Sequence, residues 1–463
     1  MCTKEAPASL TIYNYHCLLA TQRPLLPSLP QQPQRWPRGP WNGLHAAAYA
    51  GSAKKTASTL SSGSTDIDQG DPDGWTPLMH AAMHNHSRVV KVLLENGANL
   101  SVVADEGYTA LLFATQEGHA AVVKLLVKAG ADTKDRDVDG HTPLHLSSHR
   151  GHSGVMKVLL EAGAEVDSRL PDGATPLYLA CERGHRQAVR LLLDAGTNPL
   201  LAPAGPSGDS FFPLDMASQN GYAGLVRDIL DHVGIGGCGG PTGGVDALHY
   251  AAQDQRLDVM IMLAEVGVVD TGIGLIAAVG NGRVASVRLL LRQQEEARGA
   301  GGVRAYVNDA RDGQGQTPVY RSVLECPPAA PRILQRLVEA GADVASPVPV
   351  PIDGGAALTL WTPLGLANIL KRKFAQPGDG GGEGVAEKKL HTLEALRRLL
   401  LRVEAVRATS WLWVSGLPVT GKVKNVETTS TAMASMLPIM RRRAARRGVL
   451  LAPLVRHSGK PSM

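Results

Sequence analysis

Asp73-Gly-Trp-Thr-Pro-Leu78, Glu106-Gly-Tyr-Thr-Ala-Leu111, Asp139-Gly-His-Thr-Pro-Leu144 and Asp172-Gly-Ala-Thr-Pro-Leu177 follow one another at a constant spacing of 33 residues. In these segments the acidic residue and the glycine favour a turn. Threonine is a good helix N-cap, and proline fits the first position of a helix, where its missing N–H would have had no partner. Each segment therefore predicts a turn followed at once by the start of a helix.

A second helix is predicted in each copy, behind the residue that ends the first helix, which is Asn85 in the first copy and Gly118, Gly151 and Gly184 in the others. Its apolar residues recur at matching positions, which are Val89, Val90, Leu93 and Leu94; Val122, Val123, Leu126 and Val127; Val155, Met156, Leu159 and Leu160; and Ala188, Val189, Leu192 and Leu193. This spacing gives each helix a single apolar stripe. Because one helix pair is too small to bury its own stripe, neighbouring pairs must stack into a solenoid.

A 33-residue period that opens on Thr-Pro-Leu resembles the ankyrin repeat. The resemblance implies an all-α fold, namely an ankyrin-repeat solenoid of stacked helix-turn-helix units with projecting loops. We expect the array to span residues 41–404, near consensus at 73–198 and divergent with loop insertions at 199–404. Residues 1–40 are rich in proline and glutamine and are expected to form a disordered arm. Residues 405–463 are expected to form a basic, poorly ordered tail.

Composition bounds the class of protein. The net charge of +5 is uneven, since residues 411–463 carry nine Lys/Arg and the single acid Glu427. No apolar run approaches the roughly 18 residues of a membrane span, and the first thirty residues lack an apolar signal core. The five cysteines follow no disulfide or zinc pattern, and Cys181 is expected to be a buried thiol. We expect a cytoplasmic protein without a membrane span, and the basic residues 441–447 leave a nuclear location open.

Histidines recur directly after the first helix of four copies, at His86, His119, His152 and His185. Equivalent positions in stacked helices lie about 8–10 Å apart, too far for several of them to bind one metal ion at about 2 Å. The ankyrin resemblance implies instead that each histidine ties its repeat to a neighbour by hydrogen bonds. We therefore predict no metal site, and no cofactor is expected.

The resemblance also implies a concave surface, formed by the first helices and the loop tips, that grips other proteins. Large side chains occur there, just after the histidine position of Thr-Pro-Leu-His, at His80, Phe113, Leu146, Leu179, Met216 and Tyr250. Trp75, Tyr108 and His141 extend this set at the bases of the loops. Contiguous exposed apolar surface usually marks an interaction site, so we predict that these nine residues bind a partner. The alternative is that the side chains are core shared between helices.

Basic residues recur on the outer face of the second helices, at Lys91, Lys124, Lys157 and Arg190. They could form a ridge for an acidic partner. Acidic residues three or four positions further on favour an ordinary solvated face instead.

One segment outside the repeats carries a different motif. A strand-like apolar run from Trp411 leads into Gly416-Leu-Pro-Val-Thr-Gly421-Lys422, which resembles the P-loop segment of NACHT-type NTPases. Val423 stands where the motif needs a hydroxyl for magnesium, and the residues that follow are too few for the rest of such a fold.

We therefore predict a protein that is not an enzyme, a non-catalytic protein–protein interaction scaffold or adaptor. The alternative is a regulatory ankyrin array attached to a truncated or degenerate P-loop NTPase module. The expected partners are other proteins, with neither a small-molecule substrate nor nucleic acid.

Overall fold

The structure is a computed structural model that describes residues 42–414, except 64, 105–106, 204–210, 235–243, 313–314, 347, 352–357 and 375–382. Its contacts divide the chain into two compact units. Unit 1 contains the helices up to residue 265, unit 2 contains the elements from residue 318 onward, and the division falls within α16 (Ile273–Gly280) and α17 (Val284–Asp309).

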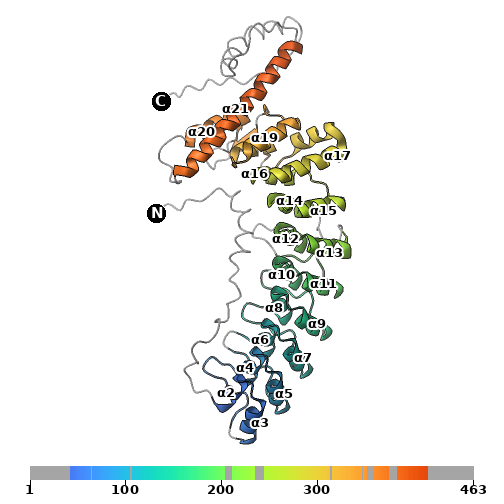
Figure 1. Cartoon of the computed structure of the whole chain (residues 1–463), viewed down its shortest axis with the longest axis vertical. Helices are drawn as coiled ribbons and strands as arrows, with labels where there is room; N and C mark the ends of the chain where they lie inside the picture. Colours follow the sequence, from blue (N-terminus) through green and yellow to red (C-terminus); the bar gives the residue numbers. More distant parts are fainter. Residues whose placement is uncertain are drawn as a thin grey trace. The chain divides into compact units, whose positions relative to one another are not determined.

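Unit 1 consists of alternating inner and outer helices that stand in two rows (Figure 1). The inner helices are α2 (Gly43–Tyr49), α4 (Pro77–Met83), α6 (Ala110–Gln116), α8 (Pro143–Arg150), α10 (Pro176–Arg183), α12 (Pro213–Asn220) and α14 (Val245–Gln253). The outer helices are α3 (Ala53–Ser61), α5 (Ser87–Glu95), α7 (Ala120–Lys128), α9 (Ser153–Glu161), α11 (Arg186–Asp194), α13 (Ala223–Val233) and α15 (Leu257–Glu265). Through α13, each helix packs against its partner in the pair and against the equivalent helix of the next pair. The predicted stacking of helix-turn-helix units is confirmed.

The predicted caps are present in the structure. The side chains of Thr76, Thr109, Thr142 and Thr175 each accept a hydrogen bond from the backbone N–H three residues on, at 3.2–3.4 Å. Helices α8 and α10 end at Gly151 and Gly184, which adopt the left-handed conformation. Local sequence therefore sets where these helices begin and end.

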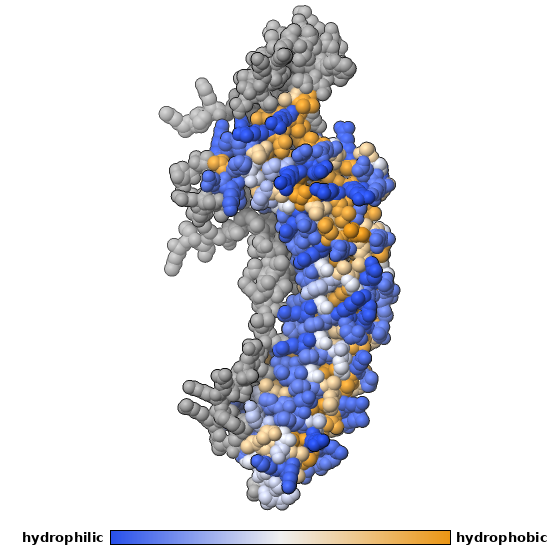
Figure 2. Space-filling view, viewed as in Figure 1, coloured by the Kyte–Doolittle hydropathy of each residue, from blue (hydrophilic) through white to orange (hydrophobic). Residues whose placement is uncertain are grey.

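The core of unit 1 lies between the two rows. The predicted stripe positions Val89, Val90 and Leu93 are fully buried in α5, and their equivalents are buried in the next three outer helices. Cys181 is buried as expected, and burial raises the pKa of its thiol. On the face seen in Figure 2, hydrophilic residues form most of the surface of unit 1, with smaller hydrophobic groups between them.

Unit 2 contains α18 (Pro318–Leu324), α19 (Ala330–Glu339), α20 (Pro363–Phe374) and α21 (Glu383–Val414). A short antiparallel hairpin of β1 (Val348–Pro351) and β2 (Leu358–Trp361) precedes α20. The protein is thus a helical repeat fold with one small hairpin among its described residues.

Helix α21 corrects two expectations about the end of the array. It continues past residue 404 to Val414, so the expected start of the poorly ordered tail at 405 is too early. The apolar run at Trp411 is helical rather than a strand, because a short apolar run is compatible with either state and the preceding helix decides it. Among the described residues, no helix combines the length and the apolar content needed to cross a membrane.

Candidate partner-binding surface

The loops that join an outer helix to the next inner helix are called fingers, and the first four of them end in the same turn. In the first finger the N–H of Asp71 donates to the carbonyl of Trp75 at 2.9 Å, and the N–H of Gly74 donates to the carbonyl of Asp71 at 2.9 Å. The first of these bonds recurs in the next three fingers from Ala104 to Tyr108, Asp137 to His141 and Leu170 to Ala174. The second recurs from Gly107 to Ala104, Gly140 to Asp137 and Gly173 to Leu170. The fingers therefore share one rigid base that positions the residue before each threonine cap.

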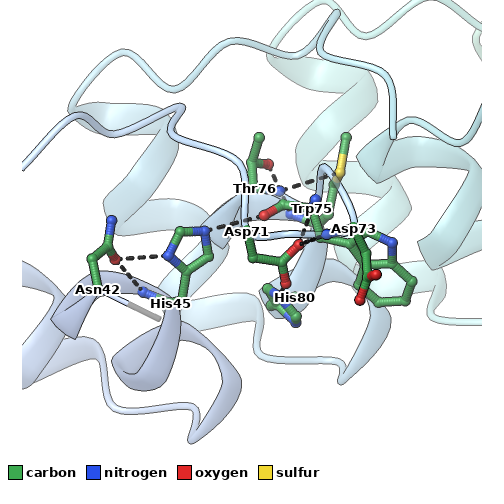
Figure 3. Close-up of polar contacts among 8 residues, drawn as sticks. Asn42, His45, Asp71, Asp73, Trp75, Thr76 and His80 are labelled. Carbon is green, nitrogen blue, oxygen red and sulfur yellow. Dashed lines mark hydrogen bonds and ion pairs between the residues drawn. The ribbon is translucent and has the colours of Figure 1, made fainter. Parts of the chain in front are cut away.

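The Asp71 side chain locks the first finger from inside (Figure 3). Its Oδ1 accepts hydrogen bonds from the backbone N–H of Trp75 at 2.9 Å and of Asp73 at 3.1 Å. Its Oδ2 lies 2.9 Å from Nε2 of His80, and the two side chains are only 2% and 6% exposed. Burial lowers the pKa of His80, although the bond to Asp71 opposes this shift.

The preceding repeat holds the same finger from the other side. Nδ1 of His45 lies 2.7 Å from Oδ1 of Asn42, and Nε2 of His45 lies 3.1 Å from the carbonyl of Trp75. Figure 3 shows His45 between these two contacts. Trp75 is consequently fixed by its own turn and by a neighbouring repeat, which leaves its backbone little freedom.

The recurring histidines tie successive repeats together, as predicted. Nε2 of each contacts a carbonyl near the end of the inner helix in the preceding repeat, from His86 to Tyr49, His119 to Met83, His152 to Gln116 and His185 to His149, at 2.8–3.0 Å. In the seventh pair Arg256 stands at the histidine position and donates from Nε to the carbonyl of Gln219 in the sixth pair at 2.9 Å. Repeat packing therefore uses these side chains.

Most of the predicted partner-binding residues are buried. Phe113, Leu146 and Leu179 are at most 1% exposed, and His80, Tyr108 and Met216 are also buried. The expectation that these six side chains stand exposed in a groove is wrong. The bases of the fingers and the neighbouring inner helices enclose this row, so it is part of the core.

Trp75, His141 and Tyr250 remain half-buried. The ring of Trp75 lies 4.4 Å from that of Phe113 and 5.3 Å from that of His80. Tyr250 packs on a buried group that contains Leu179 and Met216. Two half-buried rings, Trp75 and Tyr250, thus each rest on buried members of the predicted set.

The sequence analysis did not predict two further residues of this surface. Tyr49, the last residue of α2, and His84, directly after α4, are half-buried, with ring centroids 4.6 Å apart. Burial and three neighbouring histidines lower the pKa of His84. Neither residue belongs to the recurring motif, so the only signal was an aromatic residue near the end of each helix.

One turn offers candidate metal ligands. Donor atoms of Asp137, Asp139 and His141 lie within 4.8 Å of one another. However, Oδ1 of Asp137 already accepts hydrogen bonds from the backbone N–H groups of Asp139 and His141, at 3.0 and 2.8 Å. We assign this carboxylate the same turn-locking role as Asp71.

Comparison with known proteins places these features in a family. A family model of ankyrin repeats, in three copies, matches residues 44–137 and 132–202. An ankyrin repeat domain from Acinetobacter baumannii AYE is 31% identical over 41% of this chain and 96% of that domain, with a TM-score of 0.38. Residues 44–202 of the chain consist of ankyrin repeats. The human ASB11 ankyrin repeat domain is 29% identical to this ankyrin protein over 42% of the chain and 84% of that domain, with a TM-score of 0.37.

Other sequence predictions concern parts of the ankyrin protein that the structure leaves undescribed. The P-loop-like segment Gly416–Lys422, the basic residues 441–447 and the arm 1–40 all lie outside the described residues.

Proposed function

We propose that this ankyrin repeat protein is a non-catalytic adaptor that binds other proteins through its finger bases and the ends of its inner helices. The proposal includes a cytoplasmic location, with the nucleus as the alternative. The binding residues proposed here are Tyr49, Trp75, His84, His141 and Tyr250, each of them half-buried. Phe113 lies under Trp75, and the buried group that contains Leu179 lies under Tyr250.

One observation carries the proposal, namely that the finger bases are fixed before any partner arrives. Asp71 holds the backbone of Trp75 within its own turn, and His45 contacts the carbonyl of Trp75 from the preceding repeat. A partner that docks on such a surface meets little ordering entropy. Half-buried aromatic side chains on a rigid frame are also typical of binding hot spots.

Two triple variants of the full chain test the proposal. The first, the finger-base variant, combines Trp75→Ser, His141→Ser and Tyr250→Ser. The second combines Lys124→Ser, Lys157→Ser and Arg227→Ser on the exposed face of the outer helices. Proteins captured from a cell extract are compared after circular dichroism has established that both variants keep the helical signal and the unfolding midpoint of the unmodified chain.

The expected result is that the finger-base variant loses the proteins that the unmodified chain captures, whereas the outer-helix variant retains them. Retention of the same proteins by both variants would contradict the proposal.

A further inference from the structure

Charge is segregated between the two sides of unit 1. The first four fingers, residues 62–75, 96–108, 129–141 and 162–174, contain eleven described Asp/Glu and three Lys/Arg. The acids are Asp66, Asp68, Asp71, Asp73, Asp132, Asp135, Asp137, Asp139, Glu165, Asp167 and Asp172, and the bases are Lys134, Arg136 and Arg169.

The outer helices α3, α5, α7, α9 and α11 have the opposite balance, with nine Lys/Arg and three acids. The bases are Lys54, Lys55, Arg88, Lys91, Lys124, Lys128, Lys157, Arg186 and Arg190, and the acids are Glu95, Glu161 and Asp194. A positively charged partner is therefore attracted to the fingers and repelled by the outer helices.

Part of the acidic set has a structural role. Asp71 and Asp137 lock the turns. Oδ1 of Asp68 accepts a hydrogen bond from the N–H of Asn99 in the next finger, and Oδ1 of Asp167 accepts one from the N–H of Asn198. These acids hold fingers together, so their presence needs no ligand.

A second part of the set has no such role. Asp73, Asp139 and Glu165 are exposed, and their carboxylates accept no hydrogen bond and join no ion pair within the described residues. Asp73 and Asp139 occupy the same position in their repeats, at the tip of the turn. The fold therefore leaves carboxylates at the tips of two fingers, Asp73 and Asp139, and a third, Glu165, near the start of the fourth finger.

Trp75 adds a feature that an acidic surface alone lacks. It is half-buried, follows Asp73 by two residues and rests on Phe113 with ring centroids 4.4 Å apart. An aromatic ring beside a carboxylate attracts Lys or Arg, because the ring face binds the cation and the apolar stem of the side chain packs on the ring. Phe113 supports the ring from the core, so Trp75 is held ready for such a contact.

The repeat period sets the spacing of the partner's charges. Tips of consecutive fingers, such as those of Asp139 and Asp172, are one repeat apart, and stacked repeats lie about 8–10 Å from each other. A peptide in the extended polyproline-II conformation advances about 3.1 Å per residue and has three residues per turn, so every third side chain lies on the same face. An extended segment with a basic residue at every third position therefore places its charges in step with the fingers.

We infer that the finger face between α3 and α10 recognises an extended, Lys/Arg-rich segment of a partner protein. Its basic side chains bind Asp73, Asp139 and Glu165, and one of them packs on Trp75. The inference rests on the proposed function, because it names the chemistry of the partner that this surface binds.

The test uses the full chain and a fluorescein-labelled peptide of about twelve residues with Arg at every third position. One variant, the finger-tip variant, combines Asp73→Asn, Asp139→Asn and Glu165→Gln. The matched control combines Glu95→Gln, Glu161→Gln and Asp194→Asn, which changes the net charge equally on the outer helices. Fluorescence anisotropy gives the Kd of each protein at about 0.05 M and about 0.3 M NaCl, concentrations between which screening increases.

We expect the unmodified chain to bind the peptide with a Kd that rises with salt. The finger-tip variant should weaken binding by about tenfold at low salt, and the matched control should leave it within about twofold. Trp75→Leu should weaken binding at both salt concentrations, because the ring contact is screened less than the exposed carboxylates.

Three binding results would overturn the inference. These are no binding of the basic peptide, equal weakening of that binding in the finger-tip variant and its matched control, and binding of a Glu-substituted peptide as tight as that of the Arg peptide. Salt-sensitive self-association in sedimentation velocity, lost in the finger-tip variant, would also overturn it, because the occupant would then be a second copy of the chain. If the basic peptide fails but the finger-base variant still loses its captured proteins, only this inference fails. If the finger-base variant and the outer-helix variant both keep those proteins, the proposed function fails as well.

Discussion

At single positions, the glycines that end the inner helices are restricted both in backbone conformation and in the space left for a side chain. Gly151 has a φ of +73°, and a Cβ placed there would lie 2.5 Å from Nδ1 of His185. That histidine ring is held in place by its contact with the carbonyl of His149. Gly151 thus serves both the left-handed backbone and the close approach of the next repeat, whereas Gly163, with a φ of +79°, has nothing within 4 Å of its Cβ position.

Alanine substitutions at these two glycines separate backbone strain from the clash. Gly163→Ala should cost about 1–2 kcal/mol, the penalty for a left-handed residue with a Cβ. Gly151→Ala should cost about 3 kcal/mol or more, because overpacking against His185 is added to that penalty. Urea denaturation followed by circular dichroism measures both, and equal losses would show that the histidine moves aside without cost.

A buried carboxyl gives the stability of unit 1 a pH dependence. Asp215 is buried in α12, and burial raises its pKa to about 8, although its Oδ2 accepts a bond from the N–H of Phe212. Between its ordinary pKa of 3.8 and about 8, the folded chain keeps a proton that the unfolded chain has released. Its contribution to stability therefore falls as the pH rises through this window.

Asp215→Asn should remove that dependence. The stability of the variant relative to the unmodified chain should grow with pH by up to about 1.4 kcal/mol per unit between pH 4 and 8, and level off above. Burial lowers the pKa of His145 to about 3, which makes stability rise with pH below 6.5 in both proteins. The difference between the two curves isolates Asp215, and parallel curves would refute the assignment.

At the scale of elements, the first outer helix is the least anchored of the equivalent helices. Only Thr56 is buried in α3, whereas α5 buries Val89, Val90 and Leu93 over the same length of nine residues. The sequence Lys54-Lys-Thr-Ala-Ser-Thr-Leu60 offers α3 little apolar surface, as is typical of a capping repeat. Opening the helical hydrogen bonds of α3 therefore exposes less apolar surface than opening those of α5.

We expect the amides of α3 to exchange with solvent deuterium at least about tenfold faster than those of α5 or α7, since local opening there exposes fewer buried apolar groups. Hydrogen-exchange mass spectrometry of the full chain measures this. Equal protection of α3 and α5 would mean that contacts along the helix pair, and not apolar burial, control the opening.

At the scale of the molecule, the array is held by contacts between neighbouring repeats. Helix α8, which contains the fully buried Leu146, packs against α6, α9 and α10. In a stack of this kind stability is close to a sum of repeats and nearest-neighbour interfaces. A defect in one repeat should therefore weaken its neighbours most.

Leu146→Ala should cost about 2–5 kcal/mol through loss of burial and the cavity that remains. Hydrogen exchange should then show the greatest loss of protection in α6 to α10, with smaller losses in α2 and α14. Val138→Ala, at an exposed side chain, is the matched control and should change neither. A uniform loss throughout unit 1 would show that it unfolds as a single cooperative block.

Much of the fold could be predicted because its signals are local and repeated. The turn, the threonine cap and the histidine ties depend on short segments that recur at a fixed period, and the structure contains them as expected. Prediction was weaker where the period breaks. The run at Trp411 has a strand-like composition, and its helical state depends on the long α21 that precedes it.

The candidate site could be predicted only in part. The period identified which residues are equivalent, such as Phe113, Leu146 and Leu179, without showing how deeply the finger bases cover them. Trp75 and His141 keep exposed surface at the finger base, whereas Tyr108 at the equivalent position is buried, and the recurring sequence pattern does not distinguish these cases. Tyr49 and His84 were missed because their ring contact joins two repeats and belongs to no recurring motif.

The sequence by itself determined the repeat length, the helix starts and stops, and the hydrogen-bonding residues that join successive repeats. These features depend on backbone preferences and on residues that recur in register. Only the tertiary structure decided which of the large inner-helix side chains face a partner and which are core, and which carboxylates remain without a structural role. The reason is that the exposure of a side chain depends on which side chains of the neighbouring repeat cover it. Their positions are known only once the repeats are stacked.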